Sequence, residues 1–268
     1  LATSRVLTKV HQKDIGGSYR DARSIADHVH LVTTNSMNLW QSISHPLSRY
    51  QNAFTNMTDD EYERAAVAIA ESDLIPPFVT QLIYDMSVDG TPTLARVGMW
   101  QRLLSNNTLL EETVYADTPV VSTYTQVTSF NVLDTPNSLS LSVSGSFMPS
   151  SWGHTYTVPG MLLFAARGWD WIPELQGTAQ TTYFMGFALA NETSRPAAVG
   201  SLPGFLINQF SLDIHDGHLR AATTIQNFWA FPTVLQEDGI TLLPVQRQTT
   251  ENQVVILKIP EVQGNETG

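Results

Sequence analysis

The chain has 268 residues, a formal net charge of −11 and no cysteine, which excludes disulfide scaffolds, thiol catalysis and cysteine-ligated metal. Charged residues make up only 15% of the chain, against the usual ~25%, so the surface is polar rather than ionic. The three lysines and eleven arginines form no basic arm, so we expect no strong nucleic-acid binding from this chain. No apolar run is long enough to span a membrane.

The N-terminal region, residues 1–112, is predicted to be mainly helical. Asp21 follows a glycine pair and can cap a helix. Thr58 and Glu61 have the spacing of a capping box, in which each side chain bonds to a free backbone N–H of the first turn. Pro76 and Pro77 suit the start of a further helix, since proline is tolerated there. The predicted helices cover residues 21–32, 59–71, 76–89 and 91–104.

The sequence pattern changes to a period of two from Thr113, which is typical of β-strands. Turn residues divide the region into about eight or nine strands of ordinary length. Two packed antiparallel sheets are the economical arrangement for so many strands. The sequence therefore predicts a mainly β protein: an antiparallel β-sandwich over residues 113–268, with the helical region packed on it.

The strongest local signal is a β-hairpin around Asp216-Gly217, a dipeptide typical of two-residue turns. One face of this hairpin is apolar, whereas the other carries an opposite-charge pair across the strands. The predicted partners are His215 with His218, Ile214 with Leu219, Asp213 with Arg220, Leu212 with Ala221 and Phe210 with Thr223.

Metal and sugar sites are the two chemical interpretations that the sequence offers. Asp213, His215, Asp216 and His218 could ligate a divalent ion, but the turn and the charge pair explain them more simply. The pair His28 and His30 is a weaker candidate, because residues two apart on a helix point in different directions. We therefore predict no metal site, no cofactor and no catalytic residue, and we expect that the protein is not an enzyme.

The stretch 169–174 combines two tryptophans with two carboxylates, Asp170 and Glu174. Such a group can hold a sugar, and paired carboxylates can cleave a glycosidic bond at the right separation. The favoured interpretation is that the tryptophans pack at a contact. No charged residue occurs from 135 to 166, and the aromatic residues there and beyond offer apolar surface for subunit contacts. The candidate contact residues are Trp152, Tyr156, Trp169, Trp171, Phe228, Trp229 and Phe231.

The few lysines, the polar uncharged strands, the proline-rich turns and the aromatic residues in loops resemble the coat proteins of small icosahedral viruses. This resemblance covers about Thr113 to Gly268 and implies a jelly-roll subunit that assembles into a virion within the host cell. Its partners would be copies of itself and other shell subunits. The alternative is a secreted carbohydrate-binding or glycan-processing β-sandwich, with the site at Trp169, Asp170, Trp171 and Glu174.

Overall fold

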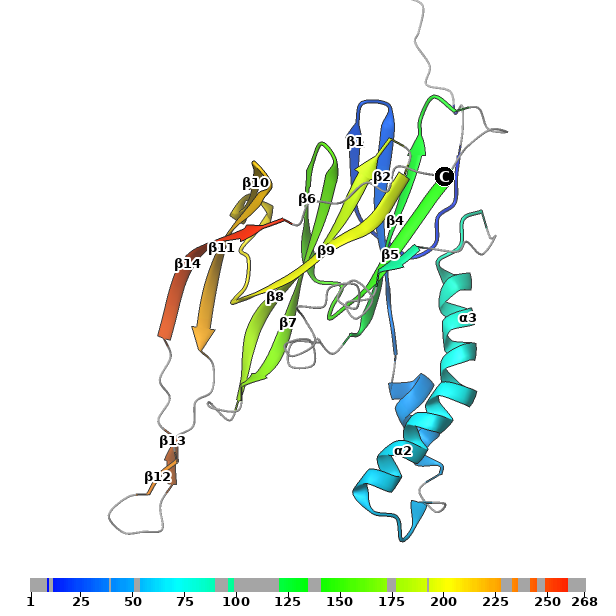
Figure 1. The fold of residues 1–268 in the computed structure, drawn as a ribbon, viewed down its shortest axis with the longest axis vertical. Coiled ribbons are helices and arrows are strands. Elements are labelled where there is room, and N and C mark those ends of the chain that lie inside the picture. Colours follow the sequence, from blue (N-terminus) through cyan, green and yellow to red (C-terminus); the bar gives the residue numbers. More distant parts are fainter. Residues whose placement is uncertain are drawn as a thin grey trace, which may run out of the picture.

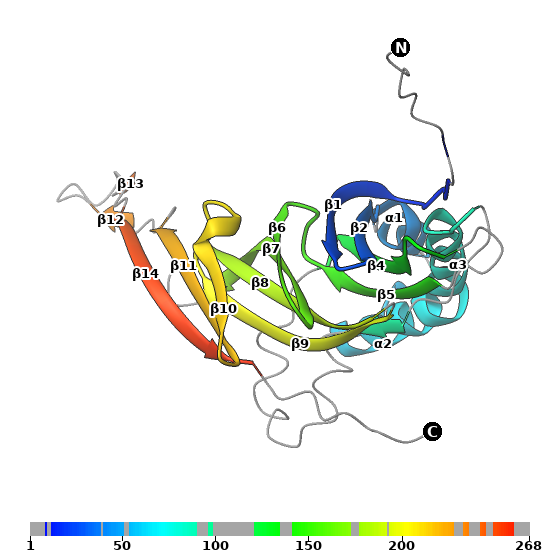
Figure 2. The same cartoon turned by 90° about the horizontal axis from the view of Figure 1, so that it is seen from above.

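The protein consists of β-sheets stacked one on another, with a group of helices at one end of the stack (Figures 1 and 2). These features come from a computed structural model. The structure describes residues 9, 12–38, 40–50, 54–89, 96–98, 121–134, 141–172, 177–191, 193–227, 233–235, 242–244 and 249–259.

The first sheet lies beside the helices and has the strand order β1-β2-β4-β5-β3. All neighbours pair antiparallel except β3, which runs parallel to β5. Its strands are β1 (Ser18–Ile25), β2 (His28–Ser36), β3 (Arg96–Gly98), β4 (Thr123–Asn131) and β5 (Leu141–Met148).

The helix predicted over residues 21–32 is wrong, because β1 and β2 form a hairpin there. Ala26 at its turn has a φ of 53°. The second strand is rich in β-branched residues, and Val32 is fully buried against the neighbouring sheet. Tertiary pairing with β4 has thus overridden the local helical pattern. The helix predicted over 91–104 also fails where it is described, since residues 96–98 form β3.

The second sheet is an antiparallel meander of four strands in the order β6-β7-β8-β9. It is buried on both faces, because alternate residues of its strands enter different cores. On β7, Leu162 and Phe164 face the first sheet, while Leu163 and Ala165 face the third. The strands are β6 (Gly153–Val158), β7 (Met161–Ile172), β8 (Gly177–Ala190) and β9 (Thr193–Pro203).

The third sheet has the order β10-β11-β14 and contains the hairpin that the sequence predicts. Asp216 and Gly217 form its turn with φ values of 47° and 69°, and four of the predicted pairs are confirmed. The fifth is wrong: Phe210 lies before the strand in η5 (Gln209–Ser211) and is 85% exposed. The strands are β10 (Leu212–His215), β11 (His218–Asn227) and β14 (Thr249–Lys258); β12 (Thr233–Leu235) and β13 (Leu242–Pro244) pair separately.

Two apolar cores hold the three sheets together. The first core lies between the first and second sheets and includes Val127, Tyr183 and Phe187. The second lies between the second and third sheets and includes Phe184 and Leu219. At roughly 25 cal/mol per Å² of buried apolar surface, these two interfaces supply the main drive for folding.

The helices form one group against the first sheet. The capping box predicted at Thr58 and Glu61 is confirmed at the start of α2. Leu82 of α3 and Met86, which directly follows α3, pack with Tyr124 of the first sheet in a third, smaller core. No helix among the described residues is long and apolar enough to cross a membrane. The elements are η1 (Trp40–Ser44), α1 (His45–Ser48), α2 (Asp59–Ile69), η3 (Ala70–Leu74) and α3 (Ile75–Asp85).

The prediction of a mainly β protein with antiparallel sheets is confirmed. Its finer form, a sandwich of two sheets, differs from the described residues, in which the second sheet is packed between two others. The predicted boundary between residues 112 and 113 lies outside the described residues.

Candidate functional site

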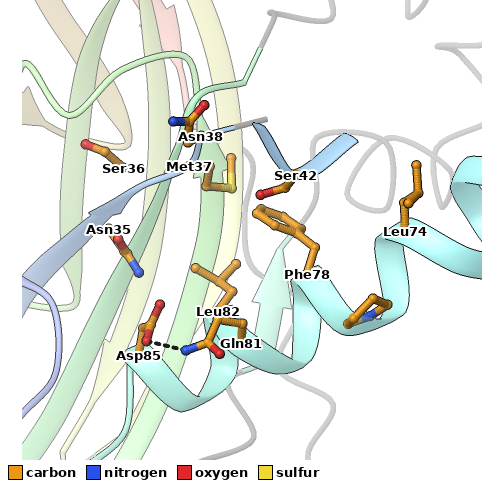
Figure 3. Close-up of a pocket in the computed structure, with 11 residues that line it drawn as sticks. Asn35, Ser36, Met37, Asn38, Ser42, Leu74, Phe78, Gln81, Leu82 and Asp85 are labelled. Atoms are coloured by element: carbon orange, nitrogen blue, oxygen red, sulfur yellow. Dashed lines mark hydrogen bonds between the residues drawn. The ribbon is translucent and has the colours of Figure 1, made fainter. Parts of the chain in front are cut away.

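A groove of about 390 Å³ lies where α3 meets the segment that follows β2 (Figure 3). We call it the helix groove and define it by Asn35, Met37, Asn38, Phe78, Gln81, Leu82 and Asp85. Its apolar part comes from the third core, because Phe78 and Leu82 point from α3 toward Met37. The groove is therefore a by-product of docking an amphipathic helix on the first sheet.

The polar groups of the helix groove are side-chain amides, the hydroxyls of Ser36 and Ser42, and one carboxylate. Gln81 donates a hydrogen bond from Nε2 to Oδ1 of Asp85 over 2.8 Å, one helical turn away. Asn35 and Asn38 approach from the opposite wall. Amides can donate and accept hydrogen bonds, and an ionised carboxylate accepts only. This set suits a ligand with peptide-like groups and a cationic donor.

A second cleft, of about 470 Å³, lies at the end of the second sheet. We call it the arginine cleft and define it by Arg20, Trp152, His154, Arg167, Phe205 and Ile207. Arg167 stands on β7, His154 on β6 and Arg20 on β1, while Trp152 lies in the segment that leads into β6. Phe205 and Ile207 come from the loop after β9.

The guanidinium of Arg167 lies over two aromatic rings. Its Cζ lies 4.9 Å from the ring centroid of Phe205 and 5.5 Å from that of Trp169, distances within the range of cation–π attraction. Arg20 donates from Nε to Oγ1 of Thr34 over 2.8 Å. Among the described residues, those that line the cleft include two arginines, one histidine and no carboxylate. Its charge is therefore opposite to that of the helix groove.

The structure separates the aromatic residues predicted as contact residues. Trp152 and Trp169 are exposed at 80% and 51% and lie at or beside the arginine cleft. Tyr156 is half-buried in the second core, and its hydroxyl donates to Oδ1 of Asp213 over 3.4 Å. Trp171 pairs through its backbone with Thr178. Phe228, Trp229 and Phe231 lie outside the described residues, as does Glu174 of the predicted sugar site.

The histidines and acidic residues of the hairpin serve its turn. His215 Nε2 lies 3.2 Å from Oδ2 of Asp216, and His218 Nδ1 lies 2.7 Å from the backbone oxygen of the same residue. Arg220 and Asp213 form the expected ion pair at 3.2 Å. Among the residues that the structure describes, no group of three or more His, Cys, Asp or Glu side chains could hold a metal ion.

The pair His28 and His30 lies on a strand, so both residues point to the same side of the sheet, contrary to the helical prediction. His30 is buried, and its Nδ1 lies 2.8 Å from Oγ of Ser129. Burial lowers the pKa of His30, and the nearby His28 lowers it further.

Sequence reasoning missed the polar residues of both sites. The spacing of Gln81 and Asp85 was a usable signal, since residues four apart share a helix face. Arg167 was also marked, because it ends the long uncharged stretch and lies two residues before a tryptophan. No local pattern could place Arg20 beside Arg167, because they belong to different sheets.

The family model described as "Beta propeller domain" matches residues 2–267. The chain belongs to the beta propeller domain family. No curated protein and no solved structure matches it. In the described part of this beta propeller family member, the sheets stack face to face in an open row and no closed ring is seen.

This family assignment corrects the functional interpretation of the sequence. The resemblance to viral coat proteins was wrong, because the match to the beta propeller family covers nearly the whole chain, including the part compared with coat proteins. The predicted role as a shell subunit is therefore also wrong, and so is the alternative of a carbohydrate-binding or glycan-processing sandwich. The resemblance rested on composition, and many β-rich proteins share such a composition.

Proposed function

We propose that this protein is a non-catalytic binding module whose helix groove takes an extended segment of a partner protein that carries a Lys or Arg side chain. The observation that carries the proposal is the combination of amides, one carboxylate and an apolar floor in the helix groove. Binding sites commonly place a few polar groups around a mainly apolar surface.

The amides match the needs of a peptide backbone. An extended peptide presents N–H and C=O groups that must find partners when water is removed. The side chains of Asn35, Asn38 and Gln81 can serve both kinds of group. The apolar surface of Phe78 can then receive a side chain of the peptide.

The carboxylate of Asp85 supplies the preference for a cation. Gln81 occupies its Oδ1, and a carboxylate has two oxygens that accept several hydrogen bonds in all. A bond to an ammonium or guanidinium would be charge-assisted and therefore stronger than a neutral one. The net charge of −11 also favours the approach of a basic segment at low salt.

The test uses labelled nonapeptides of Ala, Ser and Leu whose central residue is Arg, norleucine or Glu. We expect the Arg peptide to bind best, and Asp85→Asn to weaken it about tenfold, the scale of one charged hydrogen bond. The norleucine peptide should be insensitive to Asp85→Asn, whereas Phe78→Ala should weaken both. Mass spectrometry should recover every peptide unchanged, as a non-catalytic module requires.

Asp27→Asn is the matched control, because Asp27 is an exposed carboxylate at the turn between β1 and β2 and does not line the groove. It should leave all affinities unchanged. Equal binding of the three peptides, or an equal loss with Asp27→Asn and Asp85→Asn, would show that the groove is not the site.

A further inference from the structure

The walls of the arginine cleft come from separate parts of the chain, and backbone hydrogen bonds fix three of these parts in place. The amide of Arg167 donates to the carbonyl oxygen of Trp152 over 2.9 Å, which ties the segment before β6 to β7. Phe205 exchanges two backbone bonds of 3.0 Å with Thr224 of β11. The cleft is therefore a formed feature of the fold and not a gap between mobile loops.

Gly204 allows the loop after β9 to lie so close to β11. Its φ is 87°, and a Cβ at this position would lie 2.6 Å from the backbone oxygen of Thr224. Only glycine meets both conditions without strain. The hydroxyl of Thr182 donates to the carbonyl oxygen of Gly204 over 2.8 Å and fixes the loop from the other side. This loop places the ring of Phe205 over the Arg167 guanidinium.

We propose that the arginine cleft is a second binding site, which takes a carboxylate or phosphate group carried on an aromatic body. This inference goes beyond the proposed function, because it concerns a different cleft and a ligand of opposite charge. Carboxylate and phosphate share the chemistry that the cleft recognises, which is an oxyanion that accepts paired hydrogen bonds.

The cation–π contacts of Arg167 suit it to this task. The rings of Trp169 and Phe205 lie within cation–π distance of its Cζ, and its guanidinium is a planar fork of N–H donors that matches a carboxylate or phosphate with two parallel bonds. These contacts also limit the side-chain freedom that binding would otherwise cost. Among the described residues that line the cleft, no carboxylate is present to occupy the fork.

Two further features of the cleft indicate the rest of the ligand. Arg20 brings a second guanidinium to the same cleft, which favours an anion over any neutral group. Trp152 and Ile207 are exposed at 80% and 70%, so they offer apolar surface at the rim. An aromatic ring attached to the anion can stack on Trp152 and gain more than a small ion would.

The experiment is isothermal titration of the full chain with phenyl phosphate, benzoate, inorganic phosphate and benzyl alcohol. The two aromatic anions separate the phosphate from the carboxylate source. We expect at least one of them to bind with a dissociation constant below about 1 mM, and inorganic phosphate and benzyl alcohol to bind at least about tenfold more weakly. Arg167→Gln should reduce the affinity of the aromatic anion by about tenfold or more.

Three further variants test whether the guanidinium groups of the cleft bind the anion. Arg167→Lys keeps the charge but loses the planar fork, so its affinity should fall toward that of Arg167→Gln. Arg20→Gln changes the cleft residue that comes from the first sheet, and it should also lower the affinity for the anion. Arg195→Gln is the control, since Arg195 is exposed on β9 and does not line the cleft. Equal binding of benzyl alcohol and the aromatic anions, or full affinity in Arg167→Gln, would overturn the proposal. A negative result in this experiment would not bear on the proposed function of the helix groove.

Discussion

The helix groove and the arginine cleft differ in charge and in the cores that hold their elements in place. The groove carries a carboxylate and amides and depends on α3 docking against the first sheet through one small core. The cleft carries two guanidiniums and stands on the second sheet, which both large cores enclose. A site on an element held from both sides can fix its side chains firmly, whereas the groove depends on a helix that can be loosened separately.

The two interfaces between the sheets differ at their ends. At the first interface, the buried hydroxyls of Ser144 and Ser194 lie 2.6 Å apart. The second interface continues past Ala165 and Thr182 directly into the arginine cleft. The proposed anion site thus lies where the second interface reaches the surface.

The largest expected effect comes from emptying the core under the cleft. Phe184 is buried in the second core, on the same face of the second sheet as Ala165 and Thr182. Phe184→Ala should lower the free energy of unfolding by about 3–5 kcal/mol. Urea denaturation measures it. A loss under about 1 kcal/mol would mean that the second sheet is not enclosed on this face.

Loosening the helix should cost less and affect only the groove. Leu82 is buried between α3 and the first sheet. Leu82→Ala should destabilise by about 2–3 kcal/mol and weaken the Arg peptide, while phenyl phosphate binding stays unchanged below the unfolding range. Titration of both ligands against this variant checks the separation. An equal loss of both affinities would contradict the view that the two sites depend on different cores.

The acid sensitivity of the first sheet should depend on His30. Its pKa is lowered in the folded state, so the unfolded chain takes up the proton first as the pH falls below about 6.5. Stability should therefore decrease as the pH falls below about 6.5, by at most about 1.4 kcal/mol per pH unit from this residue. His30→Gln should show a flatter dependence in chemical denaturation over this window. An unchanged slope would count against the buried neutral imidazole.

The smallest effect is expected at the start of α2. The Thr58 hydroxyl accepts from the Glu61 amide, while the Glu61 carboxylate accepts from the Thr58 amide, which lowers the pKa of Glu61. Thr58→Ala removes the first bond and should cost about 0.5–1 kcal/mol. Thr80→Ala, at an exposed helical position outside any cap, is the comparison. Equal losses in the two variants would show that the cap adds nothing.

Local signals in the sequence predicted the parts of the fold that local chemistry decides. Asp216-Gly217 set the hairpin register because a two-residue turn leaves no other choice. Thr58 and Glu61 placed a helix start because their hydrogen bonds are formed within one turn. The period of two after Thr113 identified the antiparallel strands that the structure describes in that region.

The remaining features depend on pairing between distant residues. β2 reads as a helix in isolation and becomes a strand because β4, almost 100 residues later, pairs with it from His28 to Ser36. The arginine cleft joins Arg20 to Arg167 across different sheets, and the helix groove joins Asn35 to Asp85 across a helix and a strand. Neither site has a motif of its own in the sequence.

In these two proposals, one chain carries two independent sites that prefer ligands of opposite charge. The most direct measurement is a crossed titration, in which wild type, Asp85→Asn and Arg167→Gln are each titrated with the Arg peptide and with phenyl phosphate. We expect Asp85→Asn to lose only the peptide, Arg167→Gln to lose only phenyl phosphate, and saturation with one ligand to leave the affinity for the other unchanged. Mutual competition, or a folded variant that loses both ligands, would contradict the claim.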